Sequence, residues 1–289
     1  MSGKEPTSVG VIYRLPISEL HPHPDNPFAI REDNSMNELI ESVKSSGVLV
    51  PAIARQKDDG SYELISGHLR KKASELAGLD SMPVIVLDLD DDAAIIQLVD
   101  SNIQRENILP SERAKAYKLK MDAIKRQGAR SDLTSPKISA NFRSDDLIGQ
   151  NAGVSGDTIR NYISLTQLIP DLQQMVDEKK IALSPAYQIA ALPQNEQELL
   201  LETIESEQAT PSLSQAQRLK KLSQSGELNE DTMLSIMSEQ KKPVRNDITL
   251  SGDKLRKYFP RSYSPMQMEA VIFKLLDAWQ RKRQRDQSR

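Results

Sequence analysis

The first group of residues that could do chemistry begins at Gly67. This glycine follows a β-rich run and precedes a helical pattern, so it lies where a strand turns into a helix N-terminus. Backbone N–H groups are free at that end of a helix, and the helix dipole adds partial positive charge. Arg70 and Lys71 follow within one turn and could donate to phosphate oxygens. The pattern predicts an anion site, although cations on a solvated helix face would leave the same letters.

A second group of polar residues lies near the end of a later helix. Asn102 and Gln104 offer amides, while Arg105 offers a guanidinium group and Glu106 a carboxylate. This mixture of donors and acceptors suits a nucleoside triphosphate. Ordinary surface polar residues are the alternative interpretation.

A third pattern is typical of a helix-turn-helix. With Asp145 as position 1, apolar residues fall at positions 4, 8, 10, 15 and 18, and Gly153 falls at position 9. These apolar residues are Ile148, Ala152, Val154, Ile159 and Tyr162. The first helix is expected to bury Ile148 and Ala152. Glycine tolerates φ > 0 at the turn, and a second helix then returns Ile159 and Tyr162 to the same core.

The second helix of this unit is the candidate DNA reader. Ser155 is a good N-cap for it, and the outward-facing residues would enter the major groove. The DNA-binding candidates are Arg143, Ser155, Asp157, Thr158, Arg160, Asn161 and Ser164. Arg143 comes from the polar loop before the unit, which is either solvated or an arm along the DNA backbone. An ordinary helical hairpin is the alternative for the whole pattern.

Short strands and helices must position the first two groups. We expect strands at 11–15, 50–56, 61–66 and 82–89, and helices at 35–46, 67–76, 93–107 and 111–127. Residues 58–60, Asp-Asp-Gly, signal a hairpin, and Ser35 with Glu38 could form a capping box. The prolines of the loop at 21–28 forbid regular structure there.

The remainder of the chain is predicted to be helical. Residues 195–240 read as two or three helices whose leucines form core stripes. Pro265 opens a helix with one apolar face, formed by Met268, Val271, Ile272, Leu275, Leu276 and Trp279. That face is too apolar to stand alone, so the helix either docks on the chain or self-associates, which we favour. The expected divisions are 1–10 (disordered), 11–110, 111–195, 196–240, 241–249 (linker) and 250–289.

Composition narrows the classes of protein. The chain has no cysteine, which excludes disulfides and thiolate metal sites. It has only three histidines, two of them in the proline-rich loop, which argues against a histidine-based zinc site. No run of 18 apolar residues and no leader pattern is present, so we expect no membrane span and a cytoplasmic protein. The net charge of −3 is unevenly spread. Residues 1–110 carry 10 Lys/Arg against 18 Asp/Glu, whereas residues 111–170 carry 10 against 6 and residues 250–289 carry 10 against 4. The basic charge therefore accompanies the helix-turn-helix and the last segment, where a phosphate backbone could use it.

These stretches together resemble the ParB family of partition proteins. Residues 62–90 and 97–117 look like that family's N-terminal domain. The family has a glycine–x–Arg–Arg-type box opening a helix, and then an Asn-x-Gln-Arg box leading into a helix that starts with Pro and Glu. The helix-turn-helix follows in the same place, and residues 168–192 resemble the helical region after it. The resemblance covers roughly residues 10–195.

The resemblance implies a fold and a set of ligands. The fold is α+β: a ParB/sulfiredoxin-like domain, an all-helical helix-turn-helix domain and a C-terminal helical segment. Similar proteins bind CTP at the two boxes, close as a homodimeric clamp on double-stranded DNA, hydrolyse the nucleotide slowly and work with a ParA-like Walker-type ATPase. The nucleotide-binding candidates carried over are Gly67, His68, Arg70, Lys71, Asn102, Gln104, Arg105 and Glu106.

Two departures from the family pattern bear on Mg²⁺. His68 and Ser101 stand where similar proteins have glutamates that help to hold the divalent cation. Hard cations prefer anionic oxygen ligands, so metal binding and CTP hydrolysis are both placed in doubt. The remaining nearby oxygen donors are Asp100, Asn102 and Glu106, of which the last two are weak metal candidates.

Three functions stay open on the sequence. The first is a DNA-binding chromosome or plasmid partition factor, associated with the nucleoid or a plasmid. The second is a repressor or nucleoid-occlusion-like regulator on the same scaffold, without nucleotide turnover. The third is an enzyme such as a sulfiredoxin- or kinase-like protein, against which the absence of cysteine and the long helical remainder argue.

Overall fold

The computed structural model describes most of the chain, namely residues 11–31, 33–105, 107–131, 144–239, 255, 257–260 and 262–287. The chain divides into two compact units, Met1–Glu239 and Gln240–Arg289, and each is described by itself. Within the described residues, no helix combines the length and apolarity needed to cross a membrane. The predictions for residues 1–10 and for the linker at 241–249 lie outside this part of the chain.

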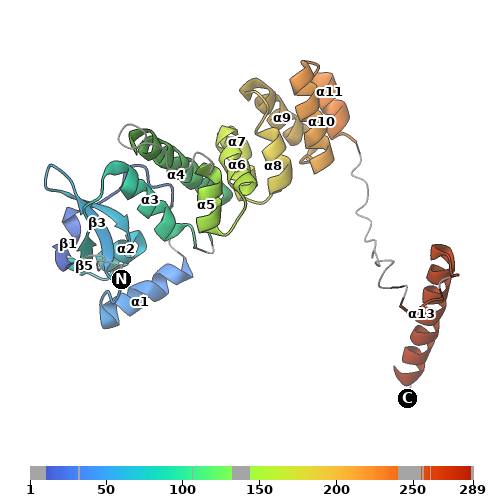
Figure 1. Cartoon of the computed structure of the whole chain (residues 1–289), viewed down its shortest axis with the longest axis horizontal. Helices are drawn as coiled ribbons and strands as arrows, with labels where there is room; N and C mark the ends of the chain where they lie inside the picture. The colour runs from blue at the N-terminus through green and yellow to red at the C-terminus, as the bar shows by residue number, and fades with distance from the viewer. Residues whose placement is uncertain are drawn as a thin grey trace, which may run out of the picture. The chain divides into compact units, whose positions relative to one another are not determined.

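A five-stranded mixed sheet forms the first layer of the larger unit (Figure 1). Its strands are β1 (Ile12–Pro16), β2 (Leu20–Pro22), β3 (Ala52–Gln56), β4 (Tyr62–Ser66) and β5 (Ser81–Val86), in the order β1-β5-β3-β4-β2. β3 pairs with β4 antiparallel and with β5 parallel, while β1 and β2 occupy the edges. The four predicted strands and the hairpin are therefore confirmed, except that β5 ends at Val86 and not at residue 89. The centre of the sheet is fully buried, and it anchors the start of the helix that follows β4. Its buried side chains include Ala52, Leu64, Met82 and Val84.

The predicted loop at 21–28 is partly wrong, because β2 includes its first two residues. Leu20–Pro22 pairs in parallel with β4 at the outer edge of the sheet. An edge strand has one unpaired side, so Pro22 can lack an N–H without breaking the ladder. Leu20 is fully buried and holds this short strand in place.

Three helices pack around the sheet, and two of their ends differ from the sequence prediction. They are α1 (Asn34–Ser46), α2 (His68–Leu76) and α3 (Asp91–Asn102). The N-cap of α1 is Asp33 and not Ser35. The Asp33 carboxylate accepts from the backbone N–H of Met36. α3 stops at Asn102 rather than at residue 107. The Asn102 amide donates to the Leu98 carbonyl, a local side-chain bond that competes with helix continuation.

The next three helices share a core with the sheet domain. α4 (Pro110–Ser131) packs against α3 and against α5 (Ser144–Ala152) and α6 (Gly156–Ser164). Their buried side chains form one cluster with those of α3 and β4, including Leu98, Tyr117, Ile148 and Ile159. This shared core fixes the helix-turn-helix relative to the end of α3.

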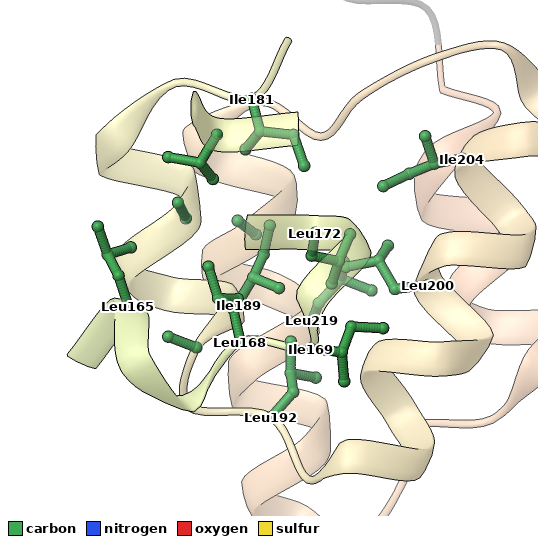
Figure 2. Packing of buried hydrophobic residues seen from close by; sticks show 14 of the residues in the cluster. Leu165, Leu168, Ile169, Leu172, Ile181, Ile189, Leu192, Leu200, Ile204 and Leu219 are labelled. Atoms are coloured by element: carbon green, nitrogen blue, oxygen red, sulfur yellow. The ribbon is translucent and has the colours of Figure 1, made fainter. Parts of the chain in front are cut away.

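A second core lies among the later helices of the same unit. These are α7 (Pro170–Asp177), α8 (Leu183–Ile189), α9 (Gln194–Glu207), α10 (Leu213–Ser225) and α11 (Glu230–Met237). Figure 2 shows how Leu172, Ile189, Leu200 and Leu219 meet at the centre of this cluster. The 3₁₀ turns are η1 (Ile17–Glu19) and η2 (Leu165–Gln167). Tyr162 packs against both cores and so joins the two helical groups.

The smaller unit contains α13 (Pro265–Gln287), which confirms the predicted helix start at Pro265. Ser264 and Gln267 cap it reciprocally, each bonding the backbone N–H of the other. Met268 is buried within the unit, whereas Leu275, Leu276 and Trp279 are 64, 52 and 58% exposed. The described residues of this unit thus leave much of the apolar face uncovered.

Candidate anion and nucleic-acid sites

Gly67 stands at the N-cap of α2 and is required there for two reasons. Its φ of +100° lies in the left-handed region that side chains rarely adopt. A Cβ at this position would also lie 2.8 Å from the Cβ of Ala52 on the adjacent strand. The backbone therefore runs against β3 as it enters the helix, which leaves the first N–H groups of α2 at the C-terminal end of β4.

Both predicted cations of the first box are engaged within the protein. Arg70 donates from Nη1 to the carbonyl oxygens of Val50 and Pro51, at 2.5 and 2.7 Å. Lys71 pairs with Glu75 one turn on, at 2.7 Å. A phosphate ligand at this helix end would have to recruit these groups from their present partners.

His68 is buried, and its ring nitrogen Nε2 has no hydrogen-bond partner among the described residues. Burial, followed by the positive charge of Arg105, lowers the pKa of His68 to about 4. The imidazole is therefore neutral at physiological pH. His68 cannot replace a carboxylate as an anionic ligand, but its ring contributes an unused polar atom inside the first box.

The structure brings Arg105 of the second box close to the first box. Burial is the largest cause that lowers the pKa of Arg70 and of His68, and the positive charge of Arg105 is the second cause for both. Burial also lowers the pKa of Arg105 itself, although guanidinium groups stay protonated in proteins. Arg70 and Arg105 repel each other and together form an electropositive site. An anion bound between them would relieve that repulsion.

The other residues of the second box are less consistent with a binding role. Asn102 is buried and donates to the Leu98 carbonyl at 2.8 Å, so its amide nitrogen serves the helix end. Ser101 donates to the same carbonyl. Gln104 is exposed just beyond the helix, and Glu106 lies outside the described residues.

A cleft of about 330 Å³ adjoins the two boxes. Arg105 and Leu69 line one part of it, while Phe28 and Arg31 line the loop side. Arg31 pairs with Glu112 at 2.6 Å, and Glu112 also accepts from the backbone N–H of Ala29, which ties the loop to α4. Sequence reasoning missed Arg31 and Glu112, because their partners lie about 80 residues apart and no spacing rule connects them.

The described side chains do not fit a divalent metal at this place. No group of three or more carboxylates or histidines gathers anywhere in the described part of the chain. Arg105 and Lys71 are among the groups whose positive charge lowers the pKa of His68, and such cations repel Mg²⁺. Asp100, a further candidate, pairs with the buried Lys120. No chemical step is therefore assigned to a metal.

The helix-turn-helix is formed as predicted by α5 and α6. Gly153 adopts a φ of +69° at the turn, and Ser155 caps α6 by accepting from the backbone N–H of Thr158 at 3.2 Å. Gly149 is needed for close approach, because a Cβ there would lie 2.5 Å from the Val154 carbonyl oxygen. Ile148 and Ile159 are fully buried, as predicted, and Ala152 and Tyr162 are partly buried against the same core.

The outward face of α6 carries the predicted reader residues in different states. Asn161 is exposed, and its side chain makes no hydrogen bond to a described residue. Arg160 instead pairs with Asp145 of α5 and with Asp157 of its own helix. Ser164 is half-buried and donates to the Asn161 carbonyl. Arg143 lies outside the described residues.

The second box and the helix-turn-helix meet at a small cavity. This space of about 200 Å³ is lined by Gln104 and Arg105 on one side and by Val154 of the turn on another. Arg113 of α4 also lines it and lies over the Tyr162 ring at 5.6 Å. The candidate anion site and the candidate DNA reader are thus neighbours.

The fold and these sites define a class: a helix-turn-helix protein that carries an α+β domain before the helix-turn-helix. Two family models match the chain in agreement with this class. The model described as ParB N-terminal domain matches residues 1–103, and the model described as ParB HTH domain matches residues 143–212.

Named relatives agree with the two models. The chain is 30% identical over 191 residues to the chromosome-partitioning protein ParB of Myxococcus xanthus, covering 66% of this chain and 58% of the relative. It is 31% identical over 180 residues to the chromosome-partitioning protein Spo0J of Thermus thermophilus, covering 62% and 60%. A nucleoid occlusion protein of Listeria innocua is 30% identical over 196 residues, covering 67% and 63%. The chain belongs to the ParB family, and its match spans about 60% of the length of these relatives.

Solved structures from the same family are also similar. A truncated chromosome-partitioning protein ParB from Caulobacter crescentus, complexed to the centromeric parS site, has a TM-score of 0.47 and 24% identity, with 72% of this chain and 98% of that chain covered. The same protein complexed with CTP-gamma-S has a TM-score of 0.31 and 26% identity, with 68% and 99% covered.

Proposed function

We propose that this chain is a sequence-specific DNA-binding protein for chromosome or plasmid partition, associated with the nucleoid or a plasmid. The observation that carries the proposal is α6, a capped helix with an exposed polar face, set in a helix-turn-helix whose glycines and apolar residues occupy the required positions. Asn161 is the strongest base reader, because amides bond adenine bidentately and its own amide has no described partner. The family membership of the chain supports the same function.

Replacing Asn161 tests this proposal. Asn161→Ala should weaken binding to a duplex selected by the wild-type protein more than binding to a scrambled duplex of the same length, because a base contact is lost. A cost of about 1–3 kcal/mol is expected for one bidentate contact. Gln150→Ala is the matched control, since that amide is exposed on α5 rather than α6. Equal losses on both duplexes would remove Asn161 from base reading.

The proposal includes CTP at the two boxes. Support comes from the helix end at Gly67, from the adjacent arginines at positions 70 and 105, and from the cleft that Arg105 lines. Arg105 also borders the cavity at the helix-turn-helix, so a bound nucleotide and bound DNA would each affect the same segment. This proximity is what a nucleotide-dependent DNA clamp needs, whether or not the nucleotide is hydrolysed. Mg²⁺ is left out, because the described residues offer it no ligand set.

A titration with each of the four nucleoside triphosphates tests the nucleotide site. CTP should bind selectively, and Arg105→Ala should weaken it at least tenfold, as expected for a charge-assisted contact of about 1.5–3 kcal/mol. Arg14→Ala is the control, because this exposed arginine lies on β1. Unchanged CTP affinity in Arg105→Ala would relocate the site. Absence of any nucleotide binding would favour a static repressor or nucleoid-occlusion-like regulator, which is the second candidate function.

We also propose that α13 joins two copies of the chain. Ile272, Leu275 and Trp279 follow a spacing of three and four residues, which matches the seam of a two-stranded coiled coil. Five large apolar side chains on this helix stay more than half exposed in the single chain: Met266, Phe273, Leu275, Leu276 and Trp279. A double change of Leu275 and Trp279 to alanine should convert a dimer into a monomer in light scattering, while Asp277→Ala should not. An unchanged mass would place the dimer interface elsewhere. A ParA-like ATPase is a further proposed partner.

A further inference from the structure

The described cations around the helix-turn-helix divide into paired and unpaired groups. Lys120 and Arg126 of α4 pair with Asp100 and Asp92 of α3, and these contacts hold the two helices together. Arg160 is likewise paired, and Arg113 lies over Tyr162. Three lysines of α4 remain with no ion pair to any described residue, and all are exposed: Lys115, Lys118 and Lys125.

These unpaired lysines lie along one side of α4. With about 100° of rotation per residue, positions 115, 118 and 125 fall within about 80° of the helix circumference. Lys118 and Lys125 also line a groove of about 480 Å³ between α4 and the helix-turn-helix. The opposite walls of this groove are formed by Asp145 of α5 and by Arg160 and Ile163 of α6.

The groove lies on the flank of the proposed reader helix. Arg160 lines this groove. Its side chain is also 46% exposed and pairs with Asp157 on the outer surface of α6. A helix in the major groove has a phosphate backbone on either side, so the element beside it meets phosphates. Here that element is α4, which packs directly against α6.

We infer that Lys118 and Lys125 of α4 hold DNA backbone phosphates beside the major groove that α6 enters. This inference rests on the proposed DNA-binding function and assigns the duplex backbone to a helix outside the helix-turn-helix itself. The two lysines position the duplex and carry no sequence information, since phosphates are the same at every base pair.

The charge balance of the groove supports an anionic occupant. Asp145 is neutralised by Arg160, so it does not oppose a phosphate strongly. Asp122 is the remaining carboxylate in the lining, against the two lysines on the same helix. The net charge of the lining is therefore positive. Long lysine side chains can extend toward phosphates at the groove edge.

The salt dependence of DNA binding tests the inference. Lys118→Ala combined with Lys125→Ala should weaken binding to the selected duplex and to the scrambled duplex by similar factors. The slope of log K against log[salt] should fall in magnitude by about 1.8, because each phosphate contact contributes about 0.9. That change corresponds to a loss of about 30-fold near 0.15 M salt if counterion release is the whole effect. Replacing both lysines by arginine should restore the wild-type slope.

A matched control removes the same charge elsewhere in the same unit. Lys220→Ala with Lys221→Ala changes two lysines on α10, a helix of the second core. If this control lowers the slope as much as the α4 variant does, the effect is one of net charge and the inference fails. An unchanged slope in the α4 variant would also overturn it. Equal melting temperatures of all variants check that no variant is unfolded, which includes the control because Lys220 is half-buried and donates to Gln188.

Failure of this inference is distinguishable from failure of the proposed function. If the wild-type protein binds its selected duplex and Asn161→Ala loses discrimination while the α4 variant does not change, the reader is right and the α4 surface is wrong. If the wild-type protein shows no preference for any duplex, the proposed function itself is wrong. In that case a lowered salt slope in the α4 variant would still assign these lysines to non-specific DNA.

Discussion

Arg160 is expected to stabilise the helix-turn-helix as well as to face DNA. Its guanidinium group bonds the carboxylate of Asp145, which is only 9% exposed at the start of α5, while Arg160 itself is 46% exposed. Arg160→Ala would leave the buried carboxylate without its cation. The second partner, Asp157, is 79% exposed, and its contribution is small because exposed pairs are screened by water.

The magnitude follows from the burial of the two partners. Removing one member of a fully buried ion pair costs about 3–5 kcal/mol. Here one partner is nearly half exposed, and the carboxylate also accepts from the backbone N–H of Asp146 at 3.2 Å. It further lies in the first turn of α5, where the helix dipole favours a negative charge. We therefore expect Arg160→Ala to cost about 1–2 kcal/mol, or about 3–6 °C of Tm for a unit of this size.

A double-mutant cycle measures this pair directly. Urea unfolding of the wild type, Arg160→Ala, Asp145→Asn and the double variant should give a coupling energy of about 1 kcal/mol. Asn161→Ala is the matched control, because that neighbouring side chain has no described partner and should leave stability unchanged. A coupling energy near zero, with Arg160→Ala as stable as wild type, would refute the reasoning. Arg160 would then serve DNA alone.

Three further outcomes follow from the structure. Gly149→Ala should destabilise the helix-turn-helix by about 1–3 kcal/mol, because its Cβ meets a backbone oxygen at 2.5 Å, and DNA binding should fall with it; an unaltered Tm would contradict the close approach. Tyr162→Ala should cost about 3 kcal/mol, since the ring packs against both helical cores and edge-on to Tyr117 and Tyr187, whereas Tyr162→Phe should cost much less in the same urea titration. For His68, whose pKa is about 4 when folded and about 6.5 when unfolded, the unfolded chain binds the extra proton between these values. Stability should therefore fall as pH drops from about 6.5 to about 4, and His68→Gln should flatten that part of the curve; a His68→Gln profile identical to wild type would show that this imidazole titrates normally.

The sequence predicted most of the elements that position the sites, because their signals are local. The spacing of Ile148, Gly153 and Ile159 predicts two helices and a turn, and neighbouring residues alone determine that geometry. Gly67 between a strand and a helix is equally local. Both predictions are confirmed by the backbone angles and the buried side chains.

Other features of the sites depend on contacts between distant parts of the chain. Asp33 caps α1, and the prediction of Ser35 is wrong. Both residues are suitable N-caps within one turn of each other, and the sequence does not determine which of them the helix start selects. The sequence predicts Arg160 as a base reader, whereas in the fold it pairs with Asp145 of the preceding helix. The ion pair of Arg31 and Glu112 joins a loop to α4. No local sequence pattern predicts this pair, because its members are far apart in the chain.

The second box shows the same limit in a functional place. Its letters predicted amides, a guanidinium group and a carboxylate in one cluster, but Asn102 bonds the end of its own helix. Only Arg105 is placed by the described structure beside the first box. Local spacing could not separate a side chain that faces a ligand from one that closes a helix.

The most direct test of the central claim is selection from a random duplex library by the full chain, followed by footprinting on the enriched sequence. A dimer carrying two copies of α6 should enrich an inverted repeat and protect two half-sites related by two-fold symmetry. Arg160 and Asn161 variants serve as the comparison on the same fragment. Enrichment of such a repeat is the predicted result. Recovery of no sequence preference, with uniform weak protection, would contradict sequence-specific DNA binding by this protein.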